Sequence, residues 1–170
     1  MSETSVVIPL SFSPLERIIL TANGNLQRIL SAYYGSTISV VIKKCERVDF
    51  ARYDREVDIL MGSQLICTAT GEIVLHTEEC REAIEHGSVG VGQLFRYLKV
   101  LPTFRLLAVG RSPTDKPLSS EGSILQHSSL WRRYELSSEQ LTCTFTERFA
   151  PGFLDFQLQS DHVAINQLKK

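Results

Sequence analysis

One glutamate lies where an acidic side chain is energetically costly. Residues 141–149 alternate between apolar and polar types, which predicts a strand whose apolar face carries Phe145, Glu147 and Phe149. A carboxylate on an apolar face is unfavourable unless it is paired or protonated, so Glu147 is a candidate for acid–base chemistry. The alternatives are that this face is solvated, or that Glu147 forms a purely structural pair with an arginine.

Arginines supply the complementary chemistry, because a guanidinium fork grips a carboxylate through two parallel hydrogen bonds. Arg55 opens an apolar strand-like run, and on its own it would be read as an ordinary surface ion-pair residue. Arg105 and Arg111 flank another strand and differ by six positions, so we expect them to share a face. Arg132 and Arg133 are adjacent and should point to opposite faces, so at most one enters a site. Solvent exposure is the ordinary alternative for all four of these later arginines.

Metal and cofactor chemistry is disfavoured by the spacing of the remaining reactive residues. None of the four cysteines forms a C-x-x-C pair, and the four histidines are scattered. We expect Cys67 and Cys143, which lie in apolar runs, to be buried thiols. There is no G-x-S-x-G elbow and no P-loop, and the glycine string at residues 87–92 lacks the dinucleotide-binding order. We therefore expect no metal and no organic cofactor.

Composition is typical of an ordinary globular domain. The chain has 170 residues, of which 43% are hydrophobic and 22% charged, and the net charge is −1. This balance gives no overall electrostatic attraction for nucleic acid, and no apolar run is long enough for a membrane span. The N-terminus has Glu3 and no basic patch, so we do not expect a signal peptide. We expect a single cytoplasmic domain over residues 1–170 that binds neither nucleic acid nor membrane.

The helices and strands that must position these side chains are predicted from the periodicity of apolar residues and from the glycines, prolines and asparagines that interrupt it. A Ser-Pro start at Ser13-Pro14 predicts a helix that Asn23-Gly24 breaks, and a second helix with Leu26, Leu30 and Tyr33 on its buried side ends at Gly35. Strands are predicted over residues 37–44, 57–61, 65–69, 104–109, 130–136 and 141–149, short helices over 78–85 and 93–98, and a surface loop over 112–122. Helices followed by hairpin-linked strands indicate an α+β fold with a single, mainly antiparallel sheet.

Six short motifs follow one another in a characteristic order. They are Leu20-Thr21-Ala22-Asn23-Gly24, Arg55-Glu56-Val57, Val89-Gly90-Val91-Gly92, Val109-Gly110-Arg111, Leu130-Trp131-Arg132-Arg133 and Thr146-Glu147-Arg148-Phe149. Together they resemble the chorismate pyruvate-lyase family over about residues 13–151, which is most of the chain. The resemblance implies one antiparallel sheet with helices on one face and a ligand enclosed beneath helical flaps.

The same resemblance implies a cofactor-independent carbon–oxygen lyase that converts chorismate to 4-hydroxybenzoate and pyruvate for ubiquinone or plastoquinone biosynthesis. It assigns Arg55 to a substrate carboxylate and Glu147 to the oxygen that becomes the phenol. It also places Asn25, Val91 and Gly92 in the substrate pocket. The secondary candidates for the second carboxylate are Arg105, Arg111, Arg132 and Arg133.

Two other classes of function stay open on the sequence. Effector domains of some bacterial regulators share this lyase fold, so the chain can also be a non-catalytic module that binds an aromatic acid. Only about twelve residues precede the resemblance, with no DNA-binding domain among them, which favours the free-standing enzyme. The third possibility is a structural α+β protein in which Glu147 is exposed and no anion-sized pocket exists.

Overall fold

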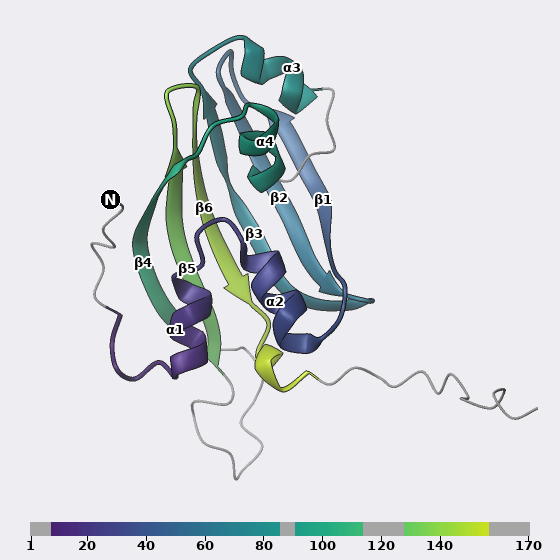
Figure 1. The fold of residues 1–170 in the computed structure, drawn as a ribbon, viewed down its shortest axis with the longest axis vertical. Coiled ribbons are helices and arrows are strands. Elements are labelled where there is room, and N and C mark those ends of the chain that lie inside the picture. The colour runs from purple at the N-terminus through teal and green to yellow at the C-terminus, as the bar shows by residue number, and fades with distance from the viewer. Residues whose placement is uncertain (1–7, 86–90, 114–127, 157–170) are drawn as a thin grey trace, which may run out of the picture.

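The computed structural model of the protein describes residues 8–85, 91–113 and 128–156, and its centre is a six-stranded antiparallel sheet (Figure 1). The strands are β1 (Ile38–Arg47), β2 (Arg52–Met61), β3 (Gln64–Leu75), β4 (Thr103–Pro113), β5 (Ser128–Ser137) and β6 (Leu141–Phe149). They lie side by side in the order β1-β2-β3-β6-β5-β4, and every neighbouring pair is antiparallel. The predicted α+β class with one antiparallel sheet is confirmed.

Four α-helices among the described residues lie over one face of this sheet (Figure 1). They are α1 (Pro14–Leu20), α2 (Leu26–Tyr34), α3 (Glu79–Glu85) and α4 (Val91–Tyr97), and a short 3-10 turn, η2 (Phe153–Asp155), follows β6. The start of α1 is as predicted, because Ser13 and Glu16 cap each other reciprocally. Gly24 and Gly35 adopt positive φ angles of 64° and 61°, which separates α1 from α2 and ends α2.

The two faces of the sheet have opposite character. Along β2 and β6, buried residues alternate with partly exposed ones, as expected when one face packs against helices and the other meets water. The buried face packs against Leu20 of α1, Leu30 of α2, Ile84 of α3 and Phe95 of α4. The opposite face is polar and rich in threonine and charge. We call these the inner and the outer face.

A β-bulge overturns one prediction about the arginines. The register of β4 against β5 shifts between Leu106 and Ala108, so the two-residue alternation changes phase within β4. As a result Arg105 pairs with Glu135 on the outer face, whereas Arg111 stands opposite Leu130 on the inner face. The prediction that Arg105 and Arg111 share a face is therefore wrong.

Other differences concern the extent of elements. The second and third strands are longer than residues 57–61 and 65–69, because their outer-face residues are charged or polar and mask the strand pattern. Tyr33, predicted to be buried, is 43% exposed, and its hydroxyl donates a hydrogen bond of 2.8 Å to the carbonyl of Leu154. Residues 112–113 belong to β4, and residues 114–122 of the predicted loop lie outside the described part.

No helix in the described ranges is long and apolar enough to cross a membrane.

Candidate functional site

A cavity of about 570 Å³ lies between the inner face of the sheet and the start of α2. Its floor is formed by apolar side chains of β1, β2, β3, β5 and β6, and its wall by the connection between α1 and α2. The lining residues are Gly24, Asn25, Leu26, Gln27, Arg28, Val40, Ile42, Val57, Ile59, Ala69, Arg96, Arg132, Tyr134, Leu136, Phe145 and Glu147. An apolar floor with a few convergent polar groups is typical of a small-molecule site.

Glu147 lies in the floor of the cavity and is held by two donors. It is 4% exposed and stands directly opposite Arg132 across the β5–β6 pair. Arg132 Nε donates to Glu147 Oε2 at 2.6 Å, and the hydroxyl of Tyr134 donates to Glu147 Oε1 at 2.9 Å. The prediction that Glu147 shares an apolar face with its strand neighbours is confirmed, and an arginine pairs with it there.

Arg132 is fully buried and connects the floor to the wall of the cavity. Its Nη1 donates to the carbonyl oxygens of Ile19 (3.0 Å), Leu20 (3.1 Å) and Ala22 (2.7 Å) at the end of α1. The carbonyls of the last turn of α1 carry the negative end of the helix dipole, so a guanidinium is well suited to them. Arg132 Nη2 is buried and has no hydrogen-bond partner among the described residues.

The charge state of this cluster follows from its surroundings. Burial, the largest single effect, lowers the pKa of Arg132, but the Glu147 carboxylate together with Tyr134 and Cys67 raises it by more, so the net pKa of Arg132 is raised. Burial, reinforced by the same carboxylate, raises the pKa of Tyr134 well above its usual value. Arg132 is therefore a permanent cation and Tyr134 a neutral donor. The guanidinium also lies over the Tyr134 ring, 4.6 Å from the ring centroid.

Arg55 lies on the same face of the sheet as Glu147 but is not among the residues that line this cavity. Arg55 pairs with Gly71 of β3, which pairs with Phe145 of β6, so Arg55 and Glu147 are two strands and two positions apart. That geometry separates their α-carbons by roughly 12 Å. Arg55 is 3% exposed, and burial lowers the pKa of its guanidinium. Arg55 is also one of the residues that line a second, different hollow.

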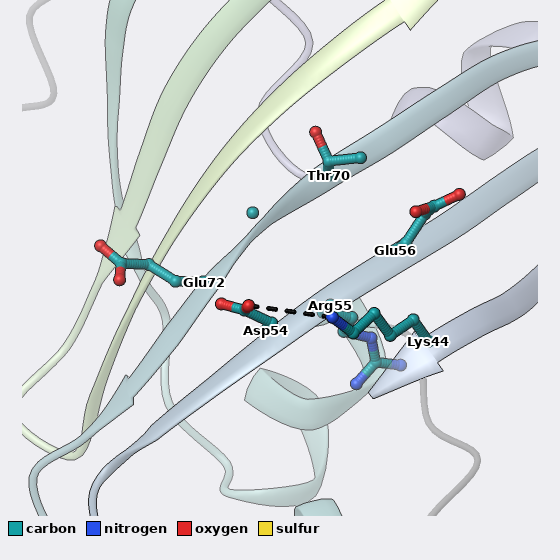
Figure 2. A pocket seen from close by; sticks show the side chains of 7 residues that line it. Lys44, Asp54, Arg55, Glu56, Thr70 and Glu72 are labelled. Carbon is teal, nitrogen blue, oxygen red and sulfur yellow. Dashed lines mark ion pairs between the residues drawn. The ribbon is translucent and has the colours of Figure 1, made fainter. Parts of the chain in front are cut away.

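This second hollow has a volume of about 380 Å³ and is lined mostly by charged residues (Figure 2). Figure 2 shows Lys44, Asp54, Glu56 and Glu72 around it, and the Lys44 ammonium lies 4.0 Å from the Asp54 carboxylate. Ion pairs in such exposed positions contribute little free energy. The hollow therefore has the character of a solvated sheet face.

The remaining predicted site residues lie in different places. Asn25 lies in the cavity wall, where its Oδ1 is buried without a hydrogen-bond partner among the described residues. Val91 and Gly92 are the first residues of α4, and the positions of their side chains lie outside what the structure describes. Arg105 lies on the outer face, where it pairs with Glu135 at 3.1 Å, and it is not among the residues that line the cavity.

Arg111 has a partner of its own on the inner face. It pairs with Glu16 at 2.7 Å, and its guanidinium lies 5.0 Å from the ring centroid of Phe12. Glu16 also caps α1, so Arg111 ties the first helix to β4. Arg111 is not among the residues that line the cavity.

Tyr134, Arg28 and Arg96 line the cavity but were not predicted to belong to a site. Tyr134 was overlooked although it follows Arg132 by two positions and so shares its face. Arg28 and Arg96 are exposed residues of α2 and α4 at the cavity, and only the tertiary packing of these helices brings them there. The four lining groups with full charge are thus three guanidiniums and one carboxylate.

Metal ligands and reactive thiols do not gather at this site. No group of three or more His, Cys, Asp or Glu side chains in the described ranges is arranged to hold a metal ion. Cys67, Cys80 and Cys143 are buried free thiols, as predicted for the first and last of these, and Cys45 is exposed.

Comparisons with known proteins add no relative. No protein-family model matches the sequence, and no curated protein matches it. The function must be argued from the sequence motifs and from the geometry of the cavity.

Proposed function

We propose that this chain is a chorismate pyruvate-lyase that converts chorismate to 4-hydroxybenzoate and pyruvate without a cofactor. The observation that carries the proposal is the 570 Å³ cavity, in which an apolar floor surrounds a buried carboxylate held by Arg132 and Tyr134. The motif order over residues 13–151 supports the same family and its fold. Quinone biosynthesis in the cytoplasm is the context that this proposal implies.

The charges at the cavity suit this substrate. Chorismate carries two carboxylates on a compact carbon ring, and the cavity offers the guanidiniums of Arg28, Arg96 and Arg132 against the single carboxylate of Glu147. Burial of a carboxylate without a cation is strongly unfavourable, so an excess of arginine favours an anionic ligand. The apolar floor accommodates the ring.

The proposed reaction needs little chemistry from the protein. The bond between the ring carbon and the enolpyruvyl oxygen breaks, the neighbouring hydroxyl-bearing carbon loses its hydrogen, and the enolpyruvyl group gains a proton to become pyruvate. Aromatisation of the ring supplies the driving force, so holding the substrate and stabilising charge are the main requirements. In this proposal Glu147 contacts the hydroxyl that becomes the phenol, and Arg55 clamps the ring carboxylate from the same face of the sheet.

The test is direct. Purified protein is incubated with chorismate, and 4-hydroxybenzoate is measured by chromatography and pyruvate by a coupled reaction. We expect equal amounts of both products, at least about a hundredfold less with Arg55→Ala or Glu147→Gln, and weaker 4-hydroxybenzoate binding with Arg55→Ala. Arg133→Ala is the matched control, since Arg133 is exposed on the outer face beside Arg132, and it should retain full activity.

Two other results would redirect the proposal. Tight binding of 4-hydroxybenzoate without turnover would mean a non-catalytic module that binds an aromatic acid, as in the regulator effector domains. If the protein neither binds 4-hydroxybenzoate nor turns over chorismate, the proposal is wrong. If Arg55→Ala binds 4-hydroxybenzoate as tightly as the wild type, the role assigned to Arg55 is wrong.

A further inference from the structure

One nitrogen of the Arg132 guanidinium, Nη2, has no hydrogen-bond partner among the described residues, whereas the other two nitrogens do. Its Nε is bonded to Glu147, and its Nη1 is shared among three carbonyl oxygens at the end of α1. Nη2 is buried without a hydrogen-bond partner in the described ranges, and Arg132 lines the cavity. A buried donor left without an acceptor costs about 1–3 kcal/mol, so this position favours a ligand that brings an acceptor.

The position of this donor indicates which ligand group it meets. In the proposed substrate the hydroxyl and the enolpyruvyl ether occupy adjacent ring carbons. If Glu147 contacts the hydroxyl, the group next to it in the ligand lies against the residue bonded to Glu147, which is Arg132. The enolpyruvyl group ends in a carboxylate, and a charged acceptor is the strongest partner for a guanidinium N–H.

We propose that Arg132 Nη2 binds the second, side-chain carboxylate of the substrate, and that Arg132 thereby links this carboxylate to the α1–α2 connection. The inference rests on the proposed function for the identity of the ligand. The link is physical, because the same guanidinium holds the carbonyls of Ile19, Leu20 and Ala22, and the residues that follow, 24–28, form the cavity wall. A dicarboxylate then fixes the wall more firmly than a monocarboxylate does.

The experiment compares two stable aromatic ligands. The probes are 4-hydroxybenzoate, with one carboxylate, and 3-(carboxymethoxy)-4-hydroxybenzoate, which adds a carboxylate at the position of the enolpyruvyl group. We expect the dicarboxylate to bind the wild type at least about tenfold more tightly by calorimetry. Arg132→Lys should reduce this ratio to near one, whatever it does to the affinity for 4-hydroxybenzoate itself. Arg133→Lys is the matched control and should preserve the ratio.

The ratio separates a ligand contact from a structural role. A purely structural role of Arg132 predicts that Arg132→Lys weakens both ligands equally, and that result overturns the proposal. An affinity ratio near one in the wild type also overturns the proposal. The same holds if the ratio is lost in Arg28→Ala or Arg96→Ala but is kept in Arg132→Lys.

A second measurement needs no variant, which matters if Arg132→Lys does not fold. Backbone hydrogen exchange over residues 20–28 of the wild type should be slower with the dicarboxylate than with 4-hydroxybenzoate, both at saturation. Equal protection by the two ligands contradicts the link to the wall. Turnover of chorismate is scored separately. If the protein is inactive but shows the affinity ratio and its dependence on Arg132, the lyase function is refuted and the carboxylate subsite is retained. If the protein is active but shows no such ratio, the lyase function is retained and the subsite is refuted.

Discussion

Replacing Glu147 by glutamine should measure what the buried ion pair contributes to stability. Arg132 is fully buried and stays charged, so Glu147→Gln leaves a buried cation without its counter-ion. Breaking one partner of a buried pair costs about 3–5 kcal/mol. The amide still accepts one hydrogen bond, and three carbonyls still surround Nη1, so we expect the lower end, about 3 kcal/mol. For a domain of this size that lowers Tm by about 6–12 °C.

The assay is urea unfolding followed by tryptophan fluorescence. Trp131 is the single tryptophan and immediately precedes Arg132 in β5, so its signal reports on this part of the sheet. The midpoint should fall while the m-value stays unchanged. Glu135→Gln is the control, because its partner Arg105 is exposed on the outer face, and it should change stability by less than about 1 kcal/mol.

The reasoning is refuted if Glu147→Gln lies within about 1 kcal/mol of the wild type, or if Glu135→Gln is equally destabilising. A double replacement sharpens the test. Arg132→Met with Glu147→Leu removes both charges, which is often neutral for an isolated buried pair. Here the carbonyls at the end of α1 also lose their donor, so the double variant should remain about 1–3 kcal/mol less stable than the wild type.

Two further predictions concern the sheet and its thiols. Gly71→Ala should lower the free energy of unfolding in urea by more than about 2 kcal/mol, because the added Cβ would lie 2.0 Å from the Thr144 carbonyl oxygen. The Cβ added by Gly62→Ala meets nothing within 4 Å, so this variant should lose only about 1–2 kcal/mol, through the positive φ of residue 62. A thiol reagent should modify Cys45 in the native protein and the other cysteines only after unfolding. Burial raises the pKa of Cys143 to about 12, so its contribution to stability is complete below about pH 8.5 and is lost as pH rises toward 12. Cys143→Ala should make that alkaline decline shallower, and an unchanged decline contradicts the assignment.

Local alternation predicted the parts of the site that depend on neighbouring strands. Strands over residues 130–136 and 141–149 were predicted as hairpin-linked neighbours, and counting outward from Ser137 opposite Thr142 brings Arg132 opposite Glu147. The pairing of these two side chains was therefore within reach of the sequence. The opposite directions of Arg132 and Arg133 were also predicted correctly.

Features that depend on distant segments or on irregular backbone were not predictable in the same way. The bulge in β4 changes the face of Arg111 relative to Arg105, and no residue type between them signals it. The carbonyls that Arg132 binds belong to α1, more than a hundred residues away in the chain. Their meeting depends on how α1 docks onto β5, which is a matter of packing and not of local pattern.

The cluster around Glu147 also limits the chemistry that this residue can perform. Each of its oxygens already accepts a hydrogen bond from a buried donor, so the carboxylate is held in one orientation and is better suited to align a hydroxyl than to leave its partners and remove a ring hydrogen. A buried ion pair is often less stabilising than apolar residues of similar volume. Retaining Arg132 here is understandable if its unpaired Nη2 serves a ligand, because the same cation then holds α1, orients Glu147 and binds the ligand in the cavity that it lines.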